Sequence, residues 1–277
     1  QNDDEDFVTR HYSDSVKDFD LKKESRTWQV RRILDQVISV TRLKEILILT
    51  GFQRLYGTPV PPDIVGESDW LPALELYGDG IFFTFNHAIL EQWEETASVH
   101  ARIRPLVNRF ENTPNETDAQ PDSDIDVCPR FILLHTISHI LIRQLEAIAG
   151  YPAASLKERI YARTGEDAMA GILIYVAVPD VEGALGGLCE QAEPKRFLSL
   201  LYQVFEHAQW CSLDPVCSEH EGQGPRLLNR SACHACALIP EPACAYGNIL
   251  LDRGLIKGSE NESLPEFLTF AGRFKEK

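Results

Sequence analysis

The sequence predicts an α/β protein with a mixed or mostly parallel central sheet flanked by helices and a small Cys-rich module near the C-terminus. Helical patterns alternate along the chain with short apolar runs, which is typical of this fold class. Residues 170–178 are apolar without interruption, as in a strand that is covered on both faces. Five of the seven cysteines fall between positions 211 and 244.

The composition is that of a globular protein. The chain has 277 residues, of which 44% are hydrophobic and 25% are charged, so disordered, collagen-like and coiled-coil classes are excluded. The net charge of -15 argues against nucleic-acid binding. However, residues 1–6 and 111–126 hold ten acids and no base, and the rest of the chain has 32 acids against 27 bases, a net charge of -5. We interpret the densest basic group as a solvated face. This group comprises Arg26, Arg31, Arg32, Arg42, Lys44 and Arg54.

We divide the chain by composition into an arm, a core in two parts, a loop, a module and a tail. The start of the sequence, Gln-Asn-Asp-Asp-Glu-Asp, indicates a fragment of a longer polypeptide. The segments are an acidic arm or linker (1–25), the N-terminal part of the α/β domain (26–110), an acidic loop (111–129), the α/β core (130–210), a Cys-rich module (211–257) and a C-terminal tail (258–277).

The first half of the chain alternates between helical and extended patterns. The apolar spacing of residues 26–49 predicts a helix, although residues 46–49 could instead form a buried strand. Residues 57–72 are rich in Pro and Gly and are expected to be loop. Residues 80–85 are β-branched and aromatic, which predicts a strand, and residues 88–109 predict a helix.

The second half contains the strongest secondary-structure signals. Residues 130–149 predict a buried helix that is capped by Gly150. Pro179 ends the strand over 170–178, and Pro194 begins a helix that reaches Cys211. No uninterrupted apolar run approaches the roughly 18 residues of a membrane span, and there is no apolar signal region. We therefore expect a cytoplasmic protein without membrane contact.

The crowded cysteines indicate a structural zinc site. Cys233 and Cys236 form a C-x-x-C pair, and two thiolates at this spacing can bind one tetrahedral zinc. Fifteen residues separate Cys217 from Cys233, which also suits a zinc module. A disulfide scaffold is disfavoured by the odd cysteine count and the missing secretory signal, and a redox pair would open a helix after a strand.

Five cysteines compete for four ligand positions. We predict Cys217, Cys233, Cys236 and Cys244 as the ligands, with Cys211 in reserve because it continues the apolar stripe of the helix before it. His220 and His234 are possible substitutes. Cys128 and Cys189 are expected to be structural.

Several motifs together resemble one protein family. The specific part is Cys211-Ser-Leu-Asp-Pro-Val-Cys217, the Cys233/Cys236 pair, and Cys244 followed by Asn248 and Leu-Asp-Arg at 251–253. It resembles the C-terminal domain of DrmB proteins from bacterial DISARM antiphage systems, which is related to a domain of MrfA-type DNA-repair helicases. The resemblance runs from about residue 26 to 257. Weaker motifs at 69–75, 78–82, 134–141, 174–175 and 183–188 occur in the same order.

The resemblance implies a zinc-stabilised partner of a DNA helicase in phage defence. The implied partner is a DrmA-like helicase subunit, and DNA would be contacted through the complex. The resemblance supplies no catalytic residues, so we expect a non-catalytic chain.

Two other functions remain open. His135 and His139 are four residues apart on one helix face and could hold a metal together with Asp180 in a metal-dependent nuclease or hydrolase. However, Thr136 occupies the position where a zincin motif has Glu, and a pair of hydrogen-bonded core histidines is the simpler interpretation. The third possibility is a purely structural adaptor that does not contact nucleic acid.

The glycine-rich segment 183–187 does not match a nucleotide-binding motif, and we interpret its glycines as serving tight packing of a loop against the sheet. Gly183, Gly186 and Gly187 follow a predicted strand, as a phosphate-binding loop would. Their spacing matches neither G-x-G-x-x-G nor a Walker A motif, and no Gly-Lys-Ser/Thr follows. A helicase motor would therefore have to be a separate chain.

Overall fold

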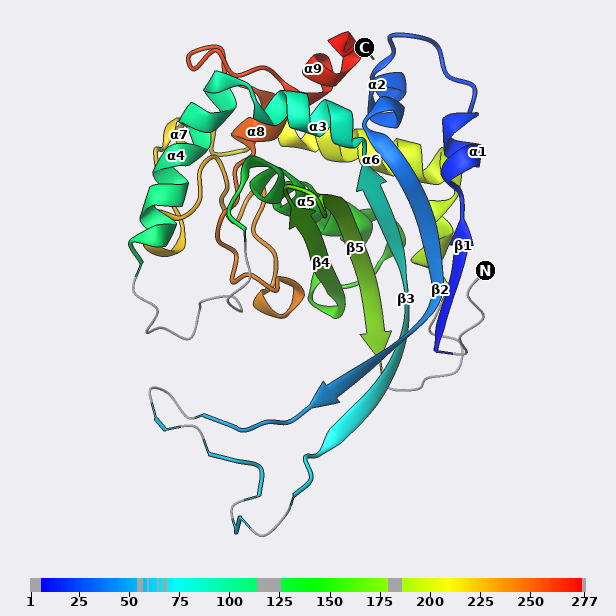
Figure 1. Ribbon diagram of the computed structural model, residues 1–277, viewed down its shortest axis with the longest axis vertical. Coiled ribbons are helices and arrows are strands. Elements are labelled where there is room, and N and C mark those ends of the chain that lie inside the picture. The colour runs from blue at the N-terminus through cyan, green and yellow to red at the C-terminus, as the bar shows by residue number, and fades with distance from the viewer. Residues whose placement is uncertain are drawn as a thin grey trace.

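The core of the protein is a curved five-stranded sheet with helices packed against one face (Figure 1). The computed structural model describes residues 6–53, 57–58, 60–63, 65–66, 69–113, 126–178 and 186–275. The strands are β1 (Phe7–His11), β2 (Leu34–Ile48), β3 (Ala73–Phe85), β4 (Leu156–Arg163) and β5 (Met169–Val178), in the spatial order β1-β2-β3-β5-β4.

Helices and short 3-10 turns make up the other regular structure of the described residues. The α-helices are α1 (Ser13–Lys17), α2 (Arg26–Arg32), α3 (His87–Glu94), α4 (Ala97–Glu111), α5 (Pro129–Ala149), α6 (Pro194–Ala208), α7 (Val216–Glu219), α8 (Gly254–Lys257) and α9 (Phe267–Arg273). Short 3-10 turns are η1 (Ala153–Ser155), η2 (Cys189–Ala192), η3 (Pro225–Leu227) and η4 (Glu241–Ala243).

Every neighbouring pair in the sheet is antiparallel, so the prediction of a mixed or mostly parallel sheet is wrong. The turn between β4 and β5 is too short for the crossover that parallel neighbours require. β5 is apolar throughout because the side chains on each of its two faces pack against other apolar side chains. Ile172 and Ile174 enter the main core, whereas Leu173 and Tyr175 pack with Val40 on the opposite face. An apolar run thus predicts a strand with two apolar faces but not its direction.

The expected helix over residues 26–49 is mostly a strand. Only α2 is helical, and β2 then runs from Leu34 to Ile48. Val37 faces the helical core and Val40 faces the opposite side. Their β-branched side chains fit a pleated surface better than a helix. The alternative of a strand at residues 46–49 is correct for Ile46 to Ile48, although these side chains are exposed rather than buried.

The buried helix predicted over residues 130–149 is confirmed as α5, which lies in the core of the protein. Pro129 occupies the first turn, and Gly150 ends the helix with a left-handed φ of 72°. By length and composition α5 could cross a membrane, since it has 21 residues that are mainly apolar. However, 78% of the apolar stretch of this helix is buried inside the protein. This burial accounts for its apolar character.

The other elements differ from the predictions mainly at their ends. The helix that begins at Pro194 is confirmed, but α6 ends at Ala208, before Cys211. The helix expected over 88–109 is two helices, α3 and α4. Strand β1 pairs with β2 from within the segment expected to be an arm. Residues 114–125 of the acidic loop and the whole segment 179–185 lie outside the described residues.

Candidate metal centre

Four cysteines converge from three neighbouring turns after α6. Cys211 lies in a tight turn in which its backbone N–H donates to Asp214 Oδ2 and its carbonyl accepts from Asp214 N, both at 2.9 Å. Cys217 lies in α7. The amides of Cys236 and Ala237 donate to the carbonyl of Cys233, which closes the C-x-x-C turn. Local hydrogen bonds therefore position all four thiols.

The sulfur atoms have the spacing of a tetrahedral zinc site. The Sγ–Sγ distances are 3.6 Å for Cys211–Cys233, 3.8 Å for Cys217–Cys236 and 3.7 Å for Cys233–Cys236. All four Sγ atoms lie within 4.8 Å of one another. A zinc–sulfur bond of about 2.3 Å places the sulfurs of a tetrahedron about 3.8 Å apart. The four cysteines therefore fit one zinc ion with no ligand from outside the set.

Hydrogen bonds to sulfur affect the four thiols unequally. The amides of Leu213 and Cys233 donate to Cys211 Sγ and Cys236 Sγ, each at 3.4 Å. The hydrogen bond from Cys236 lowers the pKa of Cys217 to about 5, and the resulting thiolate raises the pKa of Cys236 far above its usual range. The sulfurs thus compete for protons, and a divalent cation relieves this competition by binding all of them as thiolates.

Three of the four predicted ligands lie in this cluster, and the fourth does not. The structure brings Cys217, Cys233 and Cys236 together with the reserve residue Cys211. Cys244 lies in a different cluster with His135 and His139. The suggested substitutes His220 and His234 are exposed and belong to neither cluster, whereas Cys128 and Cys189 are buried.

The Leu-Asp-Arg segment at 251–253 holds the cysteine turns against the helical core. Arg253 is fully buried and bonds Asp214 Oδ1 at 2.8 Å, the carbonyl of Ala208 at 3.0 Å and the carbonyl of Ser231 at 3.3 Å. These contacts connect the end of α6 to the turns that carry Cys211 and Cys233. The adjacent Asp252 binds Arg102 of α4 through both carboxylate oxygens, at 2.7 and 2.9 Å.

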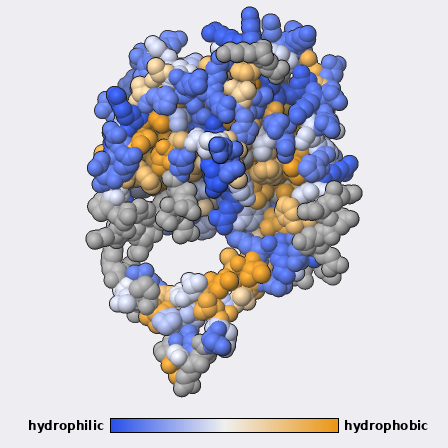
Figure 2. All heavy atoms as spheres, viewed as in Figure 1, coloured by the Kyte–Doolittle hydropathy of each residue, from blue (hydrophilic) through white to orange (hydrophobic). Residues whose placement is uncertain are grey.

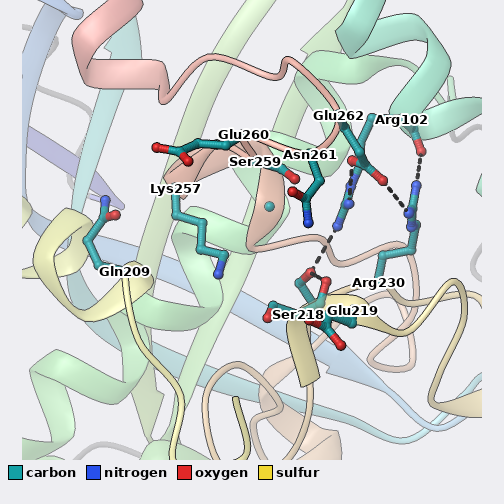
Figure 3. A pocket seen from close by; sticks show the side chains of 13 residues that line it. Arg102, Gln209, Ser218, Glu219, Arg230, Lys257, Ser259, Glu260, Asn261 and Glu262 are labelled. Atoms are coloured by element: carbon teal, nitrogen blue, oxygen red, sulfur yellow. Dashed lines mark hydrogen bonds and ion pairs between the residues drawn. The ribbon is translucent and has the colours of Figure 1, made fainter. Parts of the chain in front are cut away.

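A polar pocket of about 490 Å³ lies next to this ion pair. Figure 3 shows Arg102 and Arg230 directed toward Glu262, and each guanidinium is within 3.0 Å of its carboxylate. The charged side chains that line the pocket are three bases and three acids, so they do not favour an anionic ligand. They are Arg102, Arg230, Lys257, Glu219, Glu260 and Glu262.

We expect Asp252→Asn to destabilise the protein by about 3–5 kcal/mol, because it leaves the buried Arg102 guanidinium without its main counter-charge. The matched control is Glu190→Gln, which removes an exposed partner of Arg196 and should change stability by about 0.5 kcal/mol or less. Denaturant unfolding measures both. Equal, small effects would contradict the role assigned to the Asp252–Arg102 pair.

The basic residues singled out in the sequence are used within the fold. Arg26 pairs with Glu266, and Lys44 pairs with Asp6 and Glu75. The guanidinium groups of Arg31 and Arg32 donate to backbone carbonyls, and that of Arg42 lies over the Tyr77 ring. Arg54 lies outside the described residues. These contacts favour the interpretation of a structural and solvated group over a phosphate-binding face.

His135 and His139 lie together in the protein core with a partner that the sequence did not reveal. Both imidazoles approach Glu158 of β4, and Asp180 lies outside the described residues. Burial would raise the pKa of Glu158, but His139 and His135 lower it well below its usual range. The available signal was the alternation of Leu156, Glu158 and Ile160, which places Glu158 on the core-facing side of a strand.

Comparison with known proteins agrees with this geometry. Residues 137–237 match the model of the MrfA Zn-binding domain. The chain is 34% identical over 251 residues to DISARM protein DrmB of Bacillus paralicheniformis, an alignment that covers 86% of this chain and 44% of that relative. The chain thus spans less than half the length of the relative. The family resemblance is confirmed, and the domain match together with the four-cysteine cluster confirms the prediction of zinc.

Proposed function

We propose that this chain, a homologue of DISARM protein DrmB, is a zinc-stabilised, non-catalytic partner of a helicase-like motor in antiphage defence. Its structural zinc is held by Cys211, Cys217, Cys233 and Cys236. The chain acts in the cytoplasm and meets DNA only as part of the complex with the motor. The observation that carries this proposal is an exposed apolar β-ribbon formed by residues 46–49 and 70–74. We call this ribbon the arm from here on; it is distinct from the acidic N-terminal segment 1–25.

The arm extends beyond the rest of the sheet. Among the residues that the structure describes, β5 accompanies β3 as far as the pair Tyr77↔Val178, and β1 accompanies β2 as far as Phe7↔Leu43. β2 and β3 continue as a two-stranded ribbon to the pair Ile48↔Ala73. Figure 1 shows this ribbon leaving the body of the protein. A ribbon of two strands is marginally stable by itself, so the arm gains stability from a surface that covers it.

The arm exposes large apolar side chains on both of its faces. Their exposed fractions lie between 45% and 66%, and Figure 2 shows apolar residues gathered along the ribbon. Contiguous exposed apolar residues of this kind are typical of a protein-binding surface. The residues are Ile46, Leu47, Ile48, Leu49, Trp70, Leu71 and Leu74.

A helicase-like motor is the occupant that we propose for the arm. The chain carries no phosphate-binding loop of its own, and the family resemblance implies a helicase subunit in the same defence system. An apolar ribbon with two exposed faces requires an apolar groove on its partner, which distinguishes this contact from binding to phosphates. The basic residues described above are already paired within the fold and are therefore less available to DNA phosphates. This favours DNA contact through the complex over contact by this chain alone.

The described residues do not favour a metal-dependent hydrolase with its active site at His135 and His139. His135 and His139 are fully buried, and four protein donor atoms meet at their cluster. A catalytic metal site keeps a position open for water or substrate. The donor set found here is the kind that closes a structural site.

Co-purification tests the proposed function. The chain and the helicase-like protein of its system should form a stable complex, and the complex should bind DNA more tightly than either protein alone. A complex that binds DNA no better than the motor would leave only the adaptor function. Absence of association, or metal-dependent DNA cleavage by the chain alone, would contradict the proposal.

A further inference from the structure

We propose that the protein has a second structural metal site, which binds zinc through His135 Nε2, His139 Nε2, Glu158 Oε1 and Cys244 Sγ. These atoms come from helix α5, strand β4 and the loop after η4. They lie within 4.8 Å of one another and belong to buried residues.

Four of the six distances among these atoms can be compared with the edges of a tetrahedral site. His135 Nε2 lies 3.1 Å from Glu158 Oε1 and 3.4 Å from Cys244 Sγ. His139 Nε2 lies 3.3 Å from each of the same two atoms. Zinc bonds of about 2.0 Å to nitrogen or oxygen and about 2.3 Å to sulfur require ligand separations of roughly 3.3–3.5 Å. The observed separations agree with these values.

The surroundings orient three of the four donors as metal ligands. His139 Nδ1 lies 3.0 Å from the carbonyl oxygen of Ala237. Because a carbonyl only accepts, Nδ1 carries the proton, and in the neutral imidazole the lone pair of Nε2 points to the cluster. The amides of Tyr246 and Asn248 each donate to Cys244 Sγ at 3.3 Å, which favours a thiolate. The hydroxyl of Ser138 contacts the second oxygen of Glu158.

Counting hydrogens supports a cation at the centre of the cluster. The Nε2 atom of neutral His139 has no proton to donate, yet it contacts both a carboxylate oxygen and a sulfur. A Cys244 S–H group could satisfy only one of these contacts. One divalent ion satisfies all four donors at once, whereas the metal-free alternative is an imidazolium paired with Glu158.

The second site would connect the first site to the protein core. Ala237, whose carbonyl orients His139, directly follows the zinc ligand Cys236. The metal would cross-link α5, β4 and the Cys244 loop, so that both sites fix the Cys-rich segment onto the same central helix. Four protein donors and complete burial indicate a structural rather than catalytic role.

Metal counting and X-ray absorption at the zinc edge test this inference in the intact chain. Two sites predict two zinc ions, with five sulfur and three nitrogen or oxygen ligands in total. One site predicts a single zinc with sulfur ligands only. The wild-type protein alone thus decides between one site and two, even if every variant fails to fold.

Glu158→Gln adds the specific test, because it keeps the shape of the side chain and removes the charged ligand. This variant should retain one zinc ion, with only sulfur ligands. The matched control Cys128→Ala removes a buried thiol outside both clusters and should retain two. A wild-type count of one, unchanged in Glu158→Gln and lost in Cys236→Ser, would overturn the second site while leaving the first intact.

Discussion

Cys211→Ser is expected to remove zinc from the four-cysteine site and to unfold the segment that carries these cysteines. The segment is short of regular structure, since α7 spans only Val216–Glu219. Binding of structural zinc contributes on the order of 10 kcal/mol to the folding of small zinc modules, so losing one of four ligands should destabilise the protein by several kcal/mol. Zinc content and thermal unfolding measure the effect.

Cys128→Ser is the matched control, because Cys128 is a buried thiol outside both clusters. It precedes α5 at a position where serine is a favourable helix cap, so its stability should change little and its zinc content should stay the same. Full zinc occupancy of the sulfur site in Cys211→Ser would contradict the ligand set and restore Cys244 as the candidate fourth ligand.

Ile48→Asp is expected to weaken binding to the motor about 30-fold or more. The substitution places a charge in the apolar surface of the arm, and residues at the centre of an interface often contribute more than 2 kcal/mol each. The side chain is 55% exposed in the chain by itself, so the free protein should keep its stability. Binding affinity for the purified motor and unfolding of the free chain separate the two effects.

Ile148→Asp provides the control for this variant. Ile148 is the same residue type with a similar exposed fraction of 49%, but it lies near the end of α5 rather than on the arm. Its substitution should leave binding unchanged. Equal loss of affinity in both variants would show that added negative charge, not the arm, causes the effect.

The parts of the fold that the sequence predicts well depend on local signals. Helix α5 is specified by its apolar residues, Pro129 and Gly150, and α6 begins at Pro194 as expected. Strand direction depends instead on how distant segments pair, and an apolar run such as 170–178 carries no information on it. The strand over residues 34–48 was missed because apolar residues on two faces of a strand also fit a helical spacing.

The candidate site shows the same division between local and distant information. The C-x-x-C pair and its zinc chemistry follow from local spacing. Whether Cys211 or Cys244 lies with the other three thiols depends on where α6 ends. Because α6 stops at Ala208, the following turn directs Cys211 toward the other thiols and away from the apolar stripe it was expected to continue. Glu158 approaches the two histidines only through the pairing of β4 with the core.

Site-specific photo-crosslinking from the arm tests the central claim most directly. A photoreactive residue at position 47, on the arm, should crosslink to the purified helicase-like subunit when the two proteins are mixed, and the same residue at position 148 should not. The account predicts crosslinks from the arm to an apolar groove of the motor. A stable complex in which only position 148 crosslinks to the motor, or an arm that crosslinks only to a second copy of this chain, would contradict it.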